Sequence, residues 1–181
     1  MRHTFTQILF VLAFLSLSVF IGAPSVAKDP TTLPADADMA ADESFKSIEP
    51  LIGTKGEKHN SVLTIRIPRS DLEGRLFNEL GDIPIAAGIE SRFDFFKCPC
   101  GKVNVIGQFV VTQDESNDVI DALRKTYYIK IVSISPMMLG EKPRLQIIRF
   151  QGDGQAETLA GYLKNALNQT GDARLSPTTQ P

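Results

Sequence analysis

The chain has 181 residues, of which 43% are hydrophobic, so it is long enough and apolar enough to bury one core of ordinary size. Lysine and arginine number 19 against 21 aspartate and glutamate residues, and the pI is about 5.7. This balance argues against a nucleic-acid-binding protein and against binding to anionic membrane surfaces, both of which usually require a basic face.

Residues 1–27 have the composition of a secretory signal peptide. Arg2 and His3 form a short polar start, residues 8–22 are apolar apart from two serines, and Ser25-Val26-Ala27 supplies small residues for cleavage. The alternative is a membrane anchor, but about 15 apolar residues are short for a spanning helix, which needs about 20. We predict an exported protein, periplasmic or secreted, with no transmembrane segment after cleavage.

Residues 28–61 have Phe45 as their only aromatic residue and are rich in aspartate, alanine, threonine and proline. A segment of this composition buries little apolar surface, so it is predicted to be a flexible linker. The polar tail at residues 172–181 is predicted to be mobile. The ordered domain is expected between them, at residues 62–171.

The first strand of this domain is expected at residues 62–67, where apolar residues alternate, and Pro68 ends it. A helix is expected next, at residues 70–80. It begins with a Ser-x-x-Glu capping box, although Gly74 disfavours it by about 1 kcal/mol relative to alanine. The leucines at helical spacing are Leu72, Leu76 and Leu80.

A β-hairpin is expected at residues 93–111. Apolar residues occupy every second position on both sides of Cys98-Pro99-Cys100-Gly101, so one face is buried and the Pro/Gly break forms the tip. The alternating positions hold Phe93, Phe95, Val103, Val105, Gly107, Phe109 and Val111.

A second helix is expected after Thr112, which forms a possible capping box with Glu115. Strands are expected at residues 128–134 and 144–150, where β-branched and aromatic residues concentrate. The buried stripe of the second helix is predicted to be Val119, Ile120, Leu123 and Tyr127.

The motif Gly152-Asp153-Gly154 is predicted to turn the chain into a last helix. Its apolar stripe consists of Ala156, Leu159, Ala160, Leu163, Ala166 and Leu167. The predicted order is β-α-β-β-α-β-β-α. We therefore predict an α+β fold, in which a mainly antiparallel sheet has helices packed on one face.

Several short motifs stand in a recognisable order. They are Arg69-Ser70-Asp71-Leu72, the hairpin up to Gly107, the helix start after Thr112, Gly140-Glu141-Lys142-Pro143-Arg144 and Gly152-Asp153-Gly154. In this order the chain resembles the LppY/LpqO-type family, exported proteins built on a domain of unknown function. The resemblance covers about residues 62–170. Members often carry two copies of the domain, whereas this chain has room for one, so the resemblance implies a single-copy relative. It implies no established reaction.

Members of that family commonly carry a His-Asn-His cluster before the Glu-x-Pro-Arg motif and further histidines near the following strand end. Such histidines would suit a metal site. The matching positions in this chain hold Ser135, Pro136, Met137, Arg149 and Asp153. The only histidines are His3 and His59, so the metal site is not carried over. A degenerate relative of a histidine-metal enzyme remains one interpretation of the chain.

Cys98 and Cys100 are the sharpest local feature. Two thiolates suit a soft metal such as copper(I) or zinc, with Met137 and Met138 as thioether ligands if their loop comes near. A redox pair is the second interpretation, because a disulfide between these residues closes a small, strained and easily reduced ring. A disulfide without catalytic role, or two small turn residues, is the third.

A second candidate site consists of Arg144, Arg149 and Asp153. The free N–H groups at the start of the last helix, with two arginines on the preceding strand, could hold an anionic ligand. Against this, Asp153 would repel an anion, and an aspartate before a helix is commonly its N-cap.

Catalytic constellations cannot be built from this sequence. One histidine outside residues 1–27 permits no Ser/His/Asp or Cys/His arrangement, and no phosphate-binding glycine loop follows a strand. Two charged pairs, Arg69 with Asp71 and Glu141 with Arg144, are interpreted either as parts of a site or as solvated pairs that contribute little.

Taken together, these features predict an exported domain that binds a small ligand or another exported protein and catalyses no reaction. The alternative is a thiol-based protein that binds a soft metal, copper or zinc, or exchanges disulfides through Cys98 and Cys100. Neither prediction requires a nucleic acid or a membrane.

Overall fold

The computed structural model describes residues 45–171, which contain a six-stranded sheet with the strand order β1-β2-β5-β6-β8-β7. Its strands are β1 (Glu57–His59), β2 (Val62–Pro68), β5 (Glu90–Lys97), β6 (Val103–Thr112), β7 (Ile129–Pro136) and β8 (Leu145–Gly154). The α-helices of this part of the chain are α2 (Ile48–Ile52), α3 (Ser116–Arg124) and α4 (Ala156–Leu167). All neighbouring strands pair antiparallel, so the predicted α+β class is confirmed.

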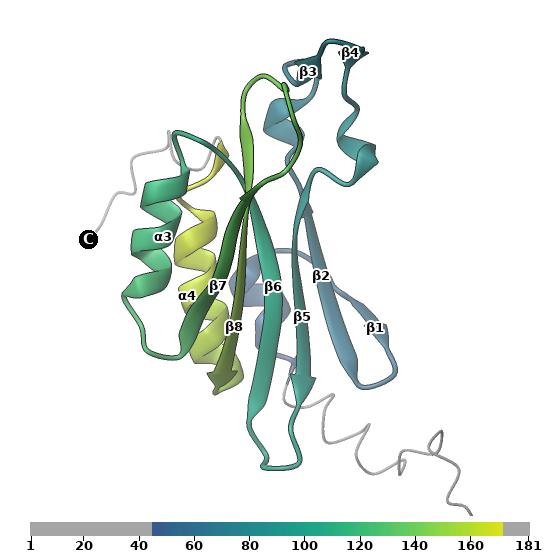
Figure 1. Cartoon of the computed structure of the whole chain (residues 1–181). Coiled ribbons are helices and arrows are strands. Elements are labelled where there is room, and N and C mark those ends of the chain that lie inside the picture. Colours follow the sequence, from purple (N-terminus) through teal and green to yellow (C-terminus); the bar gives the residue numbers. More distant parts are fainter. Residues whose placement is uncertain (1–44, 172–181) are drawn as a thin grey trace, which may run out of the picture. The chain divides into compact units, whose positions relative to one another are not determined.

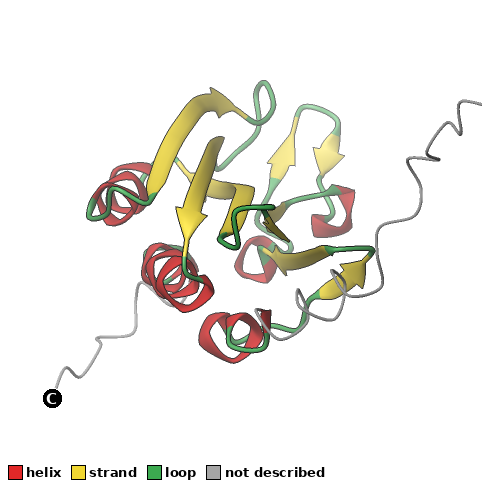
Figure 2. Cartoon of the chain, turned by 90° about the horizontal axis from the view of Figure 1, so that it is seen from below, coloured by secondary structure: helices red, strands yellow, loops and turns green. Residues whose placement is uncertain are grey.

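Alternation along the strands decides which side chains meet the helices. Phe93 and Phe95 on β5 are fully buried, whereas Arg92 and Asp94 point to the opposite face. The three helices form a layer along the buried face, as Figure 2 shows in the view from below. They contribute Ile48, Ile52, Val119, Leu123, Leu159 and Leu163 to the same core.

Three phenylalanines make the centre of this core rigid. Phe93, Phe109 and Phe150 come from adjacent strands, and their ring centroids lie 4.9 to 5.7 Å apart in tilted and edge-on arrangements. Gly107 leaves the space for one of these rings, because a Cβ there would lie 2.8 Å from Cζ of Phe150 and 2.5 Å from the carbonyl oxygen of Arg92. The sheet therefore has a close-packed core on its helix side, which supports the opposite face.

Residues 70–80 do not form the predicted helix. A single 3₁₀ turn, η1 (Ser70–Leu72), is followed by the small sheet of β3 (Phe77–Asn78) and β4 (Gly81–Asp82). A second 3₁₀ turn, η2 (Ile85–Ala87), then leads into β5. The segment from η1 to η2 lies at the upper end of the sheet in Figure 1.

The helical spacing of the leucines misled the prediction for this segment. Leu72 and Leu76 are buried, but Leu80 is 95% exposed at the β3–β4 turn. Gly74 adopts a φ of 65°, which ends any helical run, and the backbone of Phe77 exchanges two hydrogen bonds with Lys142 instead of continuing a helix. Long-range backbone pairing thus overrode a local pattern.

The prediction of a flexible linker is wrong for residues 45–61. Ile48 and Ile52 of α2 are buried in the core beside α4, and β1 pairs with β2 at the edge of the sheet. The backbone carbonyl of Ile52 accepts a hydrogen bond of 3.0 Å from Nζ of Lys164. A few apolar residues on one helical face suffice here, although the average composition of the segment is polar.

Several predictions fall on residues that the structure does not describe. The signal peptide at residues 1–27, the start of the linker at residues 28–44 and the tail at residues 172–181 lie outside the described part of the chain. The strands and the last two helices predicted within it are confirmed with shifted ends. Tyr127 was predicted to lie in the buried stripe of the second helix, but it lies beyond α3 and is 79% exposed.

The motif Gly152-Asp153-Gly154 is not a turn. It forms the end of β8 and pairs with residues 103–105 of β6. A Cβ on Gly152 would lie 2.7 Å from the carbonyl oxygen of Tyr128, so this glycine permits close approach of β7 to β8. Gln155, and not Asp153, is the N-cap residue of α4.

The face opposite the helices is covered at one end. A second apolar cluster lies there between the η1–η2 segment, the loop after β7 and the sheet. Its buried members are Leu72, Leu76, Ile85, Ile89, Val110 and Leu145. Farther along the strands, no other described segment packs an apolar cluster against this face, and its polar side chains line the hollows described next.

Candidate functional site

The part of the sheet face opposite the helices that lies beyond the second apolar cluster is called here the open face. A row of polar side chains crosses it from β2 to β8. The register places Arg66 opposite Arg92, and Arg92 opposite Gln108. Gln108 in turn lies opposite Arg149. Since neighbouring strands lie about 4.8 Å apart, the backbones of Arg92 and Arg149 are separated by about 10 Å. Three arginines from three strands therefore share one row.

Arg92 and Arg149 flank a hollow of about 470 Å³, called here the arginine hollow. Asp94, Ile106, Gln108, Val132 and Gln151 also line it. Val132 reaches the hollow because it is the extra residue of a β-bulge in β7, between the pairing positions Ile131 and Ser133. The arginine hollow contains two guanidinium groups and one carboxylate, so its lining is cationic.

Few of the guanidinium N–H groups in the arginine hollow bond to other residues of the described part of the chain. Nε of Arg92 donates to Oδ1 of Asp94 at 3.0 Å, and Oγ1 of Thr64 donates to the same oxygen at 2.6 Å. These contacts hold Arg92 in place and leave its Nη groups without a partner among residues 45–171. The side chain of Arg149 makes no hydrogen bond or ion pair within the same residues.

A second, smaller hollow of about 250 Å³ adjoins the first on the same face. It shares Ile106 and Gln151 with the arginine hollow, and it is called here the tyrosine hollow. Its other walls include the half-buried residues Phe96 and Tyr128. The two hollows together form a groove along the strands.

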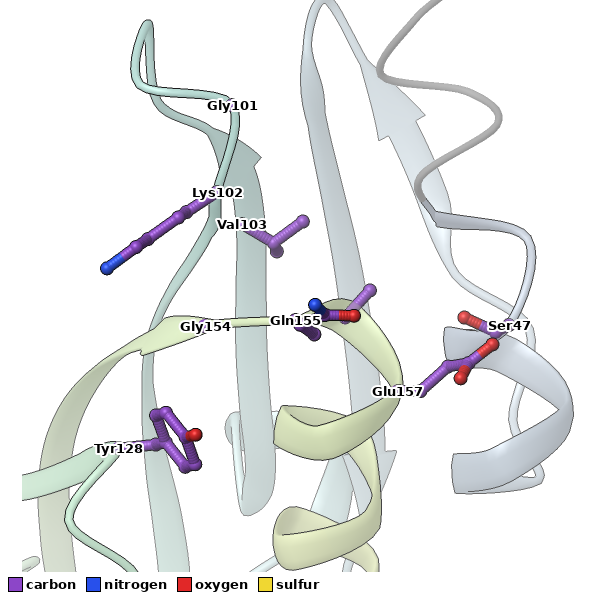
Figure 3. A pocket seen from close by; sticks show the side chains of 9 residues that line it. Ser47, Gly101, Lys102, Val103, Tyr128, Gly154, Gln155 and Glu157 are labelled. Carbon is purple, nitrogen blue, oxygen red and sulfur yellow. The ribbon is translucent and has the colours of Figure 1, made fainter.

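A third hollow, of about 660 Å³, lies where the β5–β6 turn meets the start of α4 (Figure 3). Lys102 and Tyr128 stand on one side of it, and Glu157 and Ser47 stand on the other. Lys102 already pairs with Asp153 at 3.3 Å, and both side chains are exposed. The hollow has the volume for a ligand, but its lining offers one cation, already paired, and one carboxylate.

Arg69 belongs to a different kind of cluster, which is buried and structural. It donates to both carboxylate oxygens of Asp71 at 2.7 and 2.8 Å, and to both of Glu115 at 2.9 and 3.0 Å. A further bond of 2.8 Å reaches the carbonyl oxygen of Val110. Glu115 also accepts hydrogen bonds from the backbone N–H groups of Thr112 and Gly171. The interpretation of Arg69 and Asp71 as a solvated pair is wrong.

Charge balance in this cluster shifts two pKa values. Burial by itself would raise the pKa of Asp71, but the hydrogen bonds and the charge of Arg69 outweigh burial and lower it. Burial would likewise lower the pKa of Arg69, and the carboxylates of Asp71 and Glu115 raise it instead. Both groups are therefore held in their charged forms.

Glu141 is also buried, with 3% of its surface exposed, and it does not form the predicted pair with Arg144. Its Oε1 accepts a hydrogen bond of 2.9 Å from the backbone N–H of Leu145, and its Oε2 has no hydrogen-bond partner in the described part of the chain. Through this hydrogen bond Glu141 holds the loop before β8 to the start of that strand. It lines none of the hollows described above.

Cys98 and Cys100 lie at the tip of the β5–β6 hairpin, as predicted, and are joined by a disulfide. Met137 and Met138 cannot complete a site with them. Met137 bonds to Leu145 at the far end of β6, and the ten residues of that strand span about 30 Å. Figure 1 shows the two loops at opposite ends of the sheet. Residues 45–171 contain no cluster of three or more His, Cys, Asp or Glu placed to hold a metal ion.

The predicted trio of Arg144, Arg149 and Asp153 is separated by the structure. Arg149 lies in the arginine hollow, Asp153 lies at the far end of the tyrosine hollow, and Arg144 precedes β8 and lines neither. Sequence reasoning missed Arg92 and Gln108. They alternate with the buried residues of the predicted hairpin, so they could have been assigned to its exposed face. Their approach to Arg149 depends on strand register.

Within residues 45–171, the fold and these hollows define an α+β domain with one sheet face covered by helices and the other largely open. Residues 46–169 match the family described as Domain of Unknown Function (DUF1259), and the chain belongs to this family. Comparisons with curated proteins and with solved structures give no match. Within residues 45–171, no helix has both the length and the apolar composition to cross a membrane.

Proposed function

We propose that this chain is an exported binding domain without catalytic activity, and that it binds an anionic group in the arginine hollow. The observation that carries the proposal is the pair Arg92 and Arg149, whose guanidinium groups flank Gln108 and have N–H groups to spare. Carboxylates and phosphates fit the fork of donors on a guanidinium group, and these charge-assisted hydrogen bonds are the strong ones.

The surroundings of the arginines support binding more than catalysis. Asp94 accepts hydrogen bonds from Arg92 and Thr64, and this geometry suggests only that it positions the guanidinium group of Arg92. His59, the only histidine after the proposed leader, is exposed on β1 and lies outside the arginine hollow. A site that offers donors, but no paired base and nucleophile, fits the retention of an anion.

Export and the closer relationship are part of the same proposal. The apolar stretch at residues 8–22 supports a cleaved leader, and the motif order around Gly140-Glu141-Lys142-Pro143-Arg144 supports membership of the LppY/LpqO-type proteins within the family. Intact-mass measurement of the protein recovered from the culture medium or the periplasm is expected to show a chain that begins at Lys28. A chain retained in the cell with its first residues intact would contradict export.

Binding in the arginine hollow is tested by NMR titration with inorganic phosphate and with benzoate at constant ionic strength. The backbone N–H signals of Gln108, Arg149 and Gln151 are expected to shift with a saturable dependence on concentration. Arg149→Gln should weaken binding roughly tenfold, as expected for the loss of charge-assisted bonds worth about 1.5 kcal/mol. Arg144→Gln, an exposed arginine outside the hollow, is the matched control and should leave affinity unchanged. Equal affinity of all three proteins would refute the proposal.

A second function remains for the hairpin tip. The disulfide between Cys98 and the exposed Cys100 favours thiol–disulfide exchange, in which a thiol reductant such as glutathione supplies two electrons and two protons. The reduced pair would present two thiolates to copper(I) or zinc. Native mass spectrometry of the reduced protein with either metal is expected to show uptake that Cys98→Ser abolishes. Unchanged uptake in that variant would remove this function.

A further inference from the structure

The groove on the open face is longer than an inorganic anion requires. Successive rows of side chains on one face of a strand are two residues, or about 6.8 Å, apart. The row of Arg92 and the row of Phe96 are therefore separated by about 14 Å, and the register pairs Arg92 with Gln108 and Phe96 with Asn104. The arginine hollow and the tyrosine hollow occupy this length in sequence along the strands.

Apolar side chains form the middle of the groove. Ile106 is 48% exposed and lines both hollows, and Val132 is 61% exposed at the edge of the first. Large aliphatic side chains at this exposure, beside two arginines, offer an apolar contact that a hydrated inorganic ion cannot use.

An aromatic residue lines the far part of the groove. Phe96 is half-buried and borders the tyrosine hollow. Tyr128 borders it too, but its ring packs against the helix-side core and stacks on Tyr127, with centroids 4.1 Å apart. The ring of Phe96 can pack offset or edge-on against a ring of the ligand.

The charged residues that line the tyrosine hollow are Lys130 and Asp153, and Asp153 is paired with Lys102. The other end of the groove has two guanidinium groups, of Arg92 and Arg149, and one carboxylate, of Asp94.

We propose that the ligand is an elongated aromatic organic anion, an inference that rests on the proposed anion-binding function. Its carboxylate or phosphate head lies between Arg92 and Arg149. Its apolar body lies over Ile106 and extends toward Phe96. The head requires charge and the body requires apolar area, so affinity depends on both parts.

A matched set of ligands separates these contributions, with affinity measured by NMR titration of the mature protein. Acetate, benzoate and biphenyl-4-carboxylate share one head and grow in apolar area. Affinity is expected to rise at least tenfold from acetate to biphenyl-4-carboxylate. The neutral biphenyl-4-carboxamide is expected to bind at least tenfold more weakly than its carboxylate. Phenyl phosphate against benzoate then identifies which head the arginines prefer.

Two variants locate the body of the ligand. Ile106→Ser should weaken biphenyl-4-carboxylate at least fivefold and leave inorganic phosphate unchanged. Ile134→Ser is the control, because Ile134 is similarly exposed, at 47%, and pairs with the buried Ile148 on the helix-covered face. Urea unfolding of both variants establishes that each remains folded.

The outcomes distinguish this inference from the function on which it rests. If all carboxylates and phosphate bind with similar affinity, and Arg149→Gln still weakens them, the anion site stands and the elongated aromatic ligand is refuted. If the carboxamide binds as well as the carboxylate and Arg149→Gln has no effect, both proposals fail. If affinity grows with ligand size but Ile106→Ser does not reduce it, the body lies elsewhere and the inference is overturned.

Discussion

Arg69 and Arg149 show how differently one residue type serves this protein. Arg69 is 3% exposed, and its guanidinium group bonds to two carboxylates and a carbonyl oxygen. Arg149 is exposed on the open sheet face and bonds to no described residue. The first arrangement ties segments of the fold together, and the second leaves donors for a ligand.

The difference follows from what surrounds each arginine. The Arg69 cluster joins the turn after β2, the end of β6, the start of α3 and the chain after α4. Removing a charge from water is tolerated there because every neighbouring charge is paired. On the open face, the exposed side chain of Arg149 is accessible to water, so it needs no partner among residues 45–171.

The largest expected effect separates the two arginines by stability. Arg69→Ala should lower the free energy of unfolding by about 3–5 kcal/mol, because it leaves the buried Glu115 and the half-buried Asp71 without their partner. Urea unfolding followed by circular dichroism measures the change. Arg75→Ala is the control, since Arg75 is exposed in the same segment and makes one bond, of 3.4 Å, to the carbonyl oxygen of Asp71. A loss below about 1 kcal/mol in Arg69→Ala would contradict the structural role.

A smaller effect concerns the pH dependence of the buried cluster. The pKa of Asp71 in the folded protein is lower than its ordinary value of 3.8, because hydrogen bonds and the charge of Arg69 outweigh burial, so its contribution to stability is present above that pH. It is lost as the pH falls below 3.8 through the folded pKa. The stability of Asp71→Asn should therefore fall less between pH 6 and pH 3 than that of the wild type. Parallel curves for the two proteins would exclude this assignment, and Asp121→Asn on the exposed side of α3 should follow the wild type.

The smallest expected effect is on the stability of the open face. Arg149→Gln should change the free energy of unfolding by no more than about 0.5 kcal/mol, because an exposed side chain without partners contributes little. The same urea titration measures it at the pH used for ligand binding. A larger loss would show that Arg149 supports the fold, and its effect on binding would then no longer identify a ligand contact.

The limits of the sequence-based predictions are visible in particular residues. Phe93, Phe95 and the alternating positions of β6 have a period of two, so the hairpin and its buried face were predictable. Leu80 has helical spacing from Leu76, yet it is exposed, because the backbone of Phe77 pairs with Lys142 far along the chain. Local spacing contains no information about that pairing.

The candidate site shows the same division. Arg149 was identified from the sequence, but it was grouped with Arg144 and Asp153, which are near it along the chain. The structure groups it with Arg92, a residue 57 positions earlier, through the pairing of β5 with β6 and of β6 with β8. The disulfide tip was likewise found, but the length of β6 separates it from Met137 and Met138.

Local chemistry in the sequence therefore determined the α+β class, the strands with one buried face, the apolar stripes of α3 and α4, and the hairpin tip that holds Cys98 and Cys100. These features depend on periods of two or 3.6 residues, which adjacent residues set. Tertiary structure alone decided the burial of Arg69, the end of the helix pattern at Gly74 and the meeting of Arg92 with Arg149. Those outcomes depend on strand register and on packing between distant segments, and neither is encoded in any short stretch of the chain.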